Sequence, residues 1–365
     1  MSGSIFGNNF KISTWGESHG KAIGVVIDGC PAGLELCESD IQIFLNRRKP
    51  GQSKYTTKRS ESDTIEILSG VFEGVTTGTP ISLIVFNKDQ FSKDYDDIKD
   101  VYRPSHADFT FDAKYGFRDY RGGGRSSGRE TIGRVAAGAI ASKLLKELGI
   151  KVIAYTKSIG SIEIESTEYD LEEINNNPLY MPNAEKADKA ELFLKKCMET
   201  KNSTGGIIEC QITNAPAGIG DPVFDKLDAD LSKAIMSIGA IKSIEFGDGA
   251  KVSTMLGSQN NDSFIASDNS IKKMTNHSGG ILGGISDGST IIFRASVKPT
   301  PSIAIPQNTV NRNLENIEIE IKGRHDPIIV PRAVVVVESM AAVTLFDALI
   351  NNMSSKLDNI KKLYI

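Results

Sequence analysis

Apolar runs along the chain predict short strands throughout its length. Six runs of four to seven residues are rich in β-branched and other apolar residues, and polar or glycine-containing turns bound them. The predicted strands occupy residues 24–27, 65–68, 81–86, 206–212, 251–256 and 290–296.

Apolar positions at helical spacing predict helices between these strands. One helix begins at a capping box in which Ser39 is the cap, with Ile41 and Leu45 on one face. A longer helix begins at a second capping box over residues 127–130 and ends at Gly149.

Two further helices are expected in the second half of the chain. One covers residues 228–238 and is closed by Gly239. The other covers residues 333–350, although residues 334–337 fit the start of a strand equally well. Residues 161–202 are acidic and polar and carry no usable motif.

The order of these elements predicts the fold class. Helices and strands are interleaved without a regular βαβ rhythm, which favours an α+β fold with helices against mixed or antiparallel sheets over a doubly wound parallel sheet. No linker divides the chain, so we expect residues 1–365 to form a single domain.

Composition narrows the class of protein. The 365 residues are 39% hydrophobic and 24% charged, as in ordinary soluble globular proteins. No run approaches 18 apolar residues, and the N-terminus lacks a basic start followed by an apolar stretch, so neither a membrane span nor a secretory signal is expected.

Four isolated cysteines and four separated histidines form no metal motif, and the thiols fit a reducing cytoplasm. The net charge of −4 gives no reason to expect nucleic acid binding.

Basic residues are nevertheless concentrated in two places. Residues 47–59 contain six cationic side chains and no acid, and residues 103–134 contain seven against four acids. Cationic islands on a mildly acidic protein favour pockets for small anions, whereas a solvated surface is the alternative for either cluster alone.

The sequence GESHG at residues 16–20 matches the nucleophile elbow of α/β-hydrolases, with Ser18 as the nucleophile. That elbow must open a helix, but residues 22–28 have the pattern of a strand. We therefore favour a loop that presents His19, a residue able to donate a proton near neutral pH.

The segment RGGGRSSGRE at residues 121–130 is a near miss to the phosphate-binding P-loop. Arg129 and Glu130 replace the lysine and the hydroxyl residue that magnesium-nucleotide chemistry requires. A glycine turn that leads into a helix N-terminus still favours an anion, because free N–H groups and the positive end of the dipole lie there.

Other segments supply further donors for phosphate and carboxylate groups. They are RPSHAD at 103–108, NHSGGILGG at 276–284, KPTPS at 298–302 and GRHDP at 323–327. Each segment alone is a weak signal, but together they combine cations, hydroxyls and three more histidines, which favours an enzyme site.

With these segments in view, the chain resembles the chorismate synthase family. The motifs that carry the resemblance are GESHG at 16–20, RRKPGQSKYTT at 47–57, LSGVFEGVTTGTP at 68–80, the run at 102–141, the run at 224–249, NHSGGILGGISDG at 276–288, KPTPSI at 298–303 and GRHDPIIVPRAVVVVESM at 323–340. They cover most of the chain in matching order and spacing. The resemblance implies a layered β-α-β sandwich and a homotetramer.

The resemblance also implies a reaction. The family converts 5-enolpyruvylshikimate 3-phosphate to chorismate by anti-1,4-elimination of phosphate, and it requires reduced FMN without net redox change. His19 and His106 match the two catalytic histidines, with His19 protonating the leaving phosphate and His106 at the flavin N1/O2 edge. Asp326 matches the acid that takes a proton through flavin N5.

The binding residues follow from the same match. The FMN contacts implied are Arg125, Ser126, Ser127, Gly239, Ala240, Gly283, Lys298, Pro299, Thr300, Pro301, Ser302 and Arg324. Arg48 and Lys54 match the site for NADPH or the anionic substrate. Because the substrate carries two carboxylates and a phosphate, Arg48, Arg129 and Arg134 are the further candidates to bind it.

Four positions depart from the family pattern. Ser105 and Gly128 stand where glycine and alanine are usual, and Gly239 replaces an asparagine. Lys54 replaces an arginine, which keeps the charge but loses the bidentate fork.

Three other functions remain as alternatives. The first is an FMN-dependent oxidoreductase that uses the same flavin pocket. The others are a serine hydrolase built on Ser18 and an RNA-binding module built on the RGGG patch at residues 121–124. The sequence also leaves open whether the protein reduces its flavin with NADPH or takes electrons from an external reductant, which we favour because we see no added domain.

Overall fold

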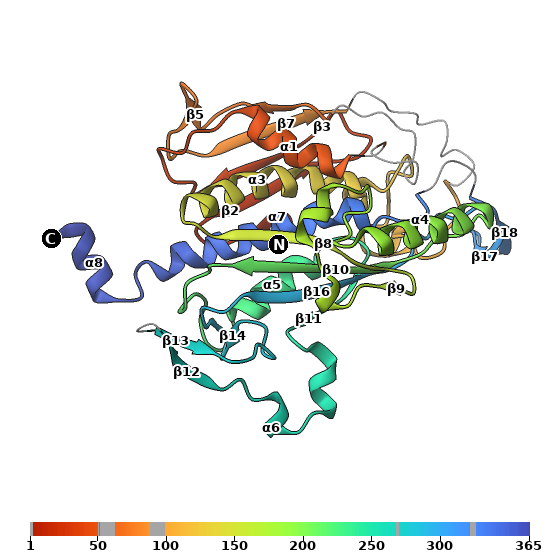
Figure 1. The fold of residues 1–365 in the computed structure, drawn as a ribbon. Helices are drawn as coiled ribbons and strands as arrows, with labels where there is room; N and C mark the ends of the chain where they lie inside the picture. The colour runs from red at the N-terminus through yellow and green to blue at the C-terminus, as the bar shows by residue number, and fades with distance from the viewer. Residues whose placement is uncertain (1–2, 50, 52–62, 88–98, 268–269, 322–325) are drawn as a thin grey trace.

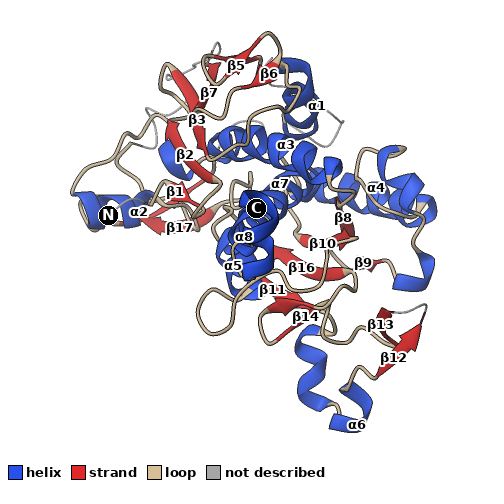
Figure 2. Cartoon of the chain, turned by 90° about the vertical axis from the view of Figure 1, so that its left-hand side faces the viewer, coloured by secondary structure: helices blue, strands red, loops and turns tan. Residues whose placement is uncertain are grey.

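The computed structural model describes residues 3–49, 51, 63–87, 99–267, 270–321 and 326–365. Two five-stranded sheets enclose a layer of helices (Figure 1), and the turned view shows the same helices between the two groups of strands (Figure 2). The predicted α+β class and the layered β-α-β sandwich are confirmed.

The first sheet is antiparallel throughout, in the spatial order β1-β2-β3-β7-β4. Its strands are β1 (Ile5–Phe6), β2 (Lys11–Gly16), β3 (Ala22–Asp28), β4 (Ile65–Ile67) and β7 (Ile81–Phe86). Alternate residues of β7 are buried, which is the pattern of a strand with one face on the core. The small hairpin of β5 (Val71–Phe72) and β6 (Val75–Thr76) lies between β4 and β7 in the chain.

The second sheet is also antiparallel, in the order β11-β16-β10-β8-β9. Its strands are β8 (Lys151–Ile159), β9 (Ile162–Glu163), β10 (Gly206–Thr213), β11 (Ile241–Phe246) and β16 (Ile291–Val297). The second half of the chain also forms three two-stranded ribbons. They are β12 (Phe264–Ser267) with β13 (Ser270–Lys273), β14 (Ile281–Leu282) with β15 (Ile285–Ser286), and β17 (Gln307–Val310) with β18 (Asn316–Ile319).

Eight helices are described, and the two longest are apolar and lie between the sheets. The helices are α1 (Glu38–Arg48), α2 (Asp108–Tyr115), α3 (Thr131–Glu147), α4 (Ala184–Glu199), α5 (Leu227–Met236), α6 (Gly257–Asn260), α7 (Val330–Asn352) and α8 (Leu357–Tyr364). Of these, α3 and α7 pack on each other, α3 contacts β3, and α7 contacts β8 and β10. An 18-residue window of α7 has a mean hydropathy of 2.0, which would suit a membrane span, but 78% of that window is buried inside the fold, as in the core helices of soluble proteins.

Several local predictions are wrong. Residues 251–256 are not a strand, because the chain turns after β11 and residues Gly249–Thr254 form a 3-10 helix. Helix α1 is capped at Cys37, with Asp40 accepting the Cys37 N–H, and not at Ser39. The long C-terminal helix starts at Val330, so its beginning is not a strand.

The ends of two other helices also differ from expectation. Ser127 caps a 3-10 turn (Gly128–Glu130) that precedes α3, whereas Glu130 bonds to Arg134 instead of completing a capping box. Helix α5 ends at Met236, and the left-handed residue that follows is Ala240 (φ 73°) and not Gly239. The motif-free stretch contains α4, which its composition did not reveal.

Glycine at one position sets the distance between the two central helices. A Cβ on Gly138 of α3 would lie 2.2 Å from Cβ and 2.5 Å from Cα of Ser339 on α7. The two backbones therefore approach closely at this point.

We expect Gly138→Ala to lower the free energy of unfolding by about 1–3 kcal/mol, because the overpacking outweighs the better helix propensity of alanine. Denaturant unfolding measures the change. The control is Gly128→Ala, where a Cβ would meet nothing within 4 Å. Equal stability of both variants would contradict the close helix contact.

Candidate active site

His19 lies on the turn between β2 and β3. The two strands form a hairpin in which Gly16 pairs with Ile23, so no helix follows Ser18. Ser18 is buried, and its Oγ lies 3.2 Å from His19 Nδ1. This geometry lacks the strand–turn–helix of a nucleophile elbow, which removes the support for a hydrolase.

The glycine turn before α3 lies directly on the His19 ring. A Cβ on Gly122 would lie 2.2 Å from His19 Nδ1 and 2.5 Å from Cε1. Only glycine at position 122 leaves room for this edge of the imidazole. The structure therefore brings together two segments that are about a hundred residues apart in the sequence.

The predicted cofactor residues at 125–127 hold this turn in place. Arg125 donates from Nη1 to the Gly16 carbonyl (3.0 Å) and from Nη2 to Thr14 Oγ1 (2.6 Å). Ser126 Oγ donates to the Gly123 carbonyl (2.6 Å), and Ser127 Oγ accepts from the Arg129 N–H (3.3 Å). In this structure the three side chains order the helix start around the His19 turn.

A buried carboxylate, that of Asp63, forms ion pairs with two of the predicted anion-binding arginines. Asp63 accepts from Arg48 at 2.5 Å and lies 3.1 Å from the Arg129 guanidinium. Arg48 and Asp63 side chains are only 2% and 1% exposed, so their charges depend on each other for stabilisation. Lys54, the other predicted binding residue nearby, lies outside the described residues.

Arg134 joins the start of α3 to the end of α5. Its Nε donates to Glu130 at 2.9 Å, and its Nη1 donates to Ser237 Oγ at 2.5 Å. The segment after Ser237 then reaches Ala240, whose carbonyl accepts from the Lys298 N–H at 2.9 Å. Gly239 has open space where a side chain would project, so an asparagine would fit there.

His106 is fixed from both ring nitrogens. Its Nδ1 lies 2.9 Å from the Pro104 carbonyl, and its Nε2 lies 3.0 Å from Ser302 Oγ. Since a carbonyl only accepts, the neutral ring carries its proton on Nδ1, and Nε2 accepts from the Ser302 hydroxyl. Asp108 does not orient the ring, because it pairs with Arg103 (2.8 Å).

Position 105 explains a departure from the family pattern. Ser105 has a φ of 58°, in the left-handed region that favours glycine, and its carbonyl accepts from Lys298 Nζ at 2.9 Å. The serine therefore keeps the backbone shape that a glycine would adopt without strain.

We expect His106 to remain neutral from pH 6 to 8. Burial, and next the charge of Arg103, lower its pKa from 6.5 to about 4. Below pH 6.5 the unfolded chain binds a proton that the folded chain excludes, so this residue lowers stability as the pH falls from 6.5 towards 4. Titration of the four histidine C–H signals by NMR tests this, and a midpoint near 6.5 for His106 would contradict it.

Asp326 lies between the buried pair of Arg48 and Asp63 and the segment that contains Thr204. Arg332 donates to Asp326 (2.6 Å) and to the Arg48 carbonyl (3.0 Å), which ties Asp326 to the buried pair of Arg48 and Asp63. On the other side, the Pro327 carbonyl accepts from the Thr204 N–H at 2.9 Å. Arg324, predicted to contact the cofactor, lies outside the described residues.

These contacts close into a ring. Ser203, the neighbour of Thr204 in the chain, donates from Oγ to the Thr300 carbonyl at 2.7 Å. Two residues further on, Ser302 contacts His106. Thus the His19 turn, the start of α3, residues 237–240, residues 298–302 and Asp326 are joined by hydrogen bonds and adjacent chain positions. The structure brings together most of the predicted site residues.

Among the predicted site residues that the structure describes, Gly283 lies apart from this ring. It lies in the hairpin of β14 and β15, beside Gly284, whose carbonyl accepts from the N–H of Leu227 at the start of α5. Ala240 follows the other end of α5, and a ten-residue helix is about 15 Å long.

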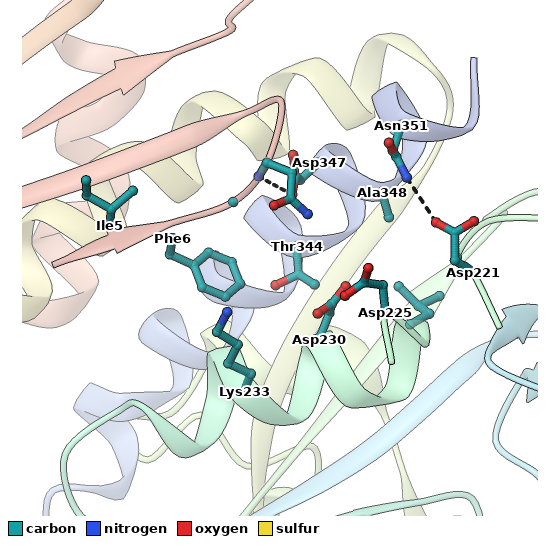
Figure 3. Close-up of a pocket in the computed structure, with 14 residues that line it drawn as sticks. Ile5, Phe6, Asp221, Asp225, Asp230, Lys233, Thr344, Asp347, Ala348 and Asn351 are labelled. Carbon is teal, nitrogen blue, oxygen red and sulfur yellow. Dashed lines mark hydrogen bonds between the residues drawn. The ribbon is translucent and has the colours of Figure 1, made fainter. Parts of the chain in front are cut away.

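A cavity of about 110 Å³ lies near the first end of α5, and its chemistry is unsuited to an anionic ligand (Figure 3). Asp221, Asp225, Asp230 and Asp347 line it together with Lys233. Burial and then Asp225 raise the pKa of Asp230, as expected where carboxylates crowd together. No described residue of the ring lines this cavity, so we place the candidate site in the ring.

Sequence reasoning missed several residues of the site. Asp63, Asn87, Ser203 and Thr204 belong to no motif, and Arg332, which lies in the motif at 323–340, was assigned no role. Their roles depend on contacts between distant segments. The available signal was weak: Asp63 is one of the first acids after the basic cluster at 47–59, where a counterion is needed.

Comparisons with known proteins show what the chain is similar to. A family model described as chorismate synthase matches residues 10–350. The chain is 65% identical over 364 residues to a chorismate synthase of Agathobacter rectalis, covering 100% of this chain and 99% of that protein. It is 54% identical over 355 residues to a chorismate synthase of Methanococcoides burtonii, covering 96% and 97%. A crystal structure of chorismate synthase matches with a TM-score of 0.77 and 31% identity, over 98% of this chain and 96% of that one.

Proposed function

Because the chain belongs to the chorismate synthase family, we propose that the ring of contacts around His19, His106 and Asp326 binds 5-enolpyruvylshikimate 3-phosphate and reduced FMN. Family membership makes the protein a chorismate-forming lyase of the shikimate pathway of aromatic biosynthesis. The proposal concerns the cofactor, the anti-1,4-elimination of phosphate, and the residues that perform it.

The charge of the ring supports an anionic substrate. Four carboxylates belong to it, Glu17 of the His19 turn, Asp63, Glu130 and Asp326, against six cations, Arg48, Arg125, Arg129, Arg134, Lys298 and Arg332. The surplus of two positive charges suits a ligand with two carboxylates and a phosphate. This surplus is the observation that carries the proposal.

The segment at 298–302 fits a flavin ligand. Thr300 Oγ1 is buried and has no hydrogen-bond partner among the residues that the structure describes, which is unusual for a buried hydroxyl. Pro299 and Pro301 restrict the backbone around it. We propose that Lys298, Thr300 and Ser302 hold FMN together with Ala240 and the turn at 125–127.

Each protein residue then has a limited task. The chemistry that reduced FMN supplies when bound is transient electron donation towards the breaking C–O bond. His19 donates a proton to the leaving phosphate, and Arg48, Arg129 and Arg134 hold the anionic groups of the substrate. Neutral His106 accepts a hydrogen bond at Nε2, and Asp326 accepts the proton removed from the substrate.

Binding of FMN tests the location. We expect Lys298→Met combined with Ser302→Ala to weaken FMN binding at least about tenfold, which corresponds to about 1.4 kcal/mol. Quenching of flavin fluorescence measures the change. The matched control is Lys233→Met in the acidic cavity, which should bind FMN like the unaltered protein. Weaker binding by the control alone would move the cofactor site to the cavity.

The remaining properties follow from the resemblance alone. We propose a cytoplasmic homotetramer that takes electrons from an external reductant, with NADPH as the alternative donor. Light scattering would then give four times the chain mass of 39.5 kDa, and addition of NADPH to the FMN-loaded protein would leave the flavin oxidised.

A further inference from the structure

Asn87, the residue after β7, makes an unusual set of contacts with the candidate site. Its Nδ2 donates to the carbonyls of Glu17 (3.0 Å) and Gly20 (2.7 Å), at the two ends of the His19 turn. Its Oδ1 accepts from Nε (3.1 Å) and Nη2 (2.7 Å) of Arg129. The side-chain orientation is determined by its partners, because two carbonyls require donors and a guanidinium requires an acceptor.

The turn that bears His19 depends on bonds from outside. Within residues 17–20 the backbone supplies the bond from the Gly20 N–H to the Glu17 carbonyl (3.1 Å). The Asn87 N–H also donates to the Lys21 carbonyl (3.1 Å), so a single residue of β7's end contacts three carbonyls of the hairpin loop. Those contacts hold the turn that places His19 against Gly122.

The same amide fixes the anion-binding side of the site. Arg129 is held between Asn87 Oδ1 and Asp63, and Asp63 also holds Arg48. One side chain therefore links the turn of the proton donor to Arg129 directly and to Arg48 through Asp63.

We propose that Asn87 is a positioning residue that holds His19 and Arg129 in their working arrangement. This inference rests on the proposed role of His19 as the proton donor. Asn87 itself acts through the His19 turn, so its loss should lower the rate of the proton transfer more than the binding of substrate.

Two substitutions separate the two contacts. Asn87→Asp keeps an acceptor for Arg129 but loses both donors, and its carboxylate oxygen repels the Glu17 and Gly20 carbonyls. We expect kcat to fall about 10- to 100-fold with little change in KM, since a displacement of about 1 Å can cost 100-fold in rate. Asn87→Ala also releases Arg129, so KM should rise as well.

The chain offers a matched control. Asn177 Nδ2 donates to the carbonyls of Glu173 (2.9 Å) and Met181 (2.8 Å) in a loop away from the site. Asn177→Asp removes the same two kinds of bond, so it should lower stability but leave kcat unchanged. Equal losses of kcat in both variants would mean that Asn87 has a structural role only.

A double-mutant cycle with His19→Ala decides the matter. If Asn87 acts through His19, Asn87→Asp should change kcat less than about twofold once His19 is absent. Independent, multiplying effects would overturn the inference. The NMR signals of His19 should also move in Asn87→Asp and not in Asn177→Asp, and unchanged signals would overturn it too. If His19→Ala alone leaves kcat intact, the proton-donor role fails instead, which is a separate result.

Discussion

Replacing His19 with alanine is expected to lower kcat by about 100- to 10,000-fold, the usual contribution of a general acid. His19 is held by Ser18 Oγ at 3.2 Å and by the backbone of Gly122, so its place is fixed before any ligand binds. Because alanine removes the proton donor and leaves the arginines in place, KM should change little. Steady-state kinetics of chorismate formation measures both values.

The control for this variant is His277→Ala. His277 pairs with Asp248 (2.7 Å), away from the ring of contacts, and its loss should leave kcat within about twofold. A small effect of His19→Ala would contradict the assignment. As a second variant, Gly122→Ala places a methyl group against the His19 ring, so it should lower kcat without removing the histidine.

The largest loss of stability is expected for Asp63→Asn. The substitution leaves Arg48 almost fully buried without a counterion, and breaking a buried ion pair in this way costs about 3–5 kcal/mol. Asparagine is chosen because Asp63 has a φ of 43°, which asparagine tolerates better than alanine. Urea unfolding followed by circular dichroism measures the free energy of unfolding.

A surface ion pair serves as the control for that experiment. Asp119 and Arg121 form a contact of 2.6 Å with side chains 32% and 52% exposed, so Asp119→Asn should cost less than about 1 kcal/mol. Similar losses in the two variants would show that burial does not raise the cost at Asp63.

Local sequence patterns predicted those elements that neighbouring residues determine. The strand at 81–86 was predicted with its observed bounds, because alternate residues face the core. The strand predicted at 251–256 does not form. Gly247 and Gly249 adopt left-handed conformations and the Glu245 carboxylate accepts from the Ala250 N–H (3.0 Å), so the chain turns into a 3-10 helix.

The residues of the site were predictable where they belong to motifs, and their contacts were not. His106 and Ser302 were both predicted, but 196 positions separate them, and no local pattern indicates that they bond to each other. Asn87 was missed for the same reason, since an asparagine after a strand looks like an ordinary turn residue. The fold brings these side chains together through sheet register and helix packing, which depend on the whole chain.

Anaerobic turnover of 5-enolpyruvylshikimate 3-phosphate with chemically reduced FMN distinguishes the proposed lyase from an oxidoreductase. Chorismate and released phosphate are followed together with the redox state of the flavin. We expect equal amounts of both products and no net flavin oxidation. Folded protein that binds FMN but releases no phosphate, or that oxidises the flavin in step with product, would overturn the proposed function and favour an oxidoreductase.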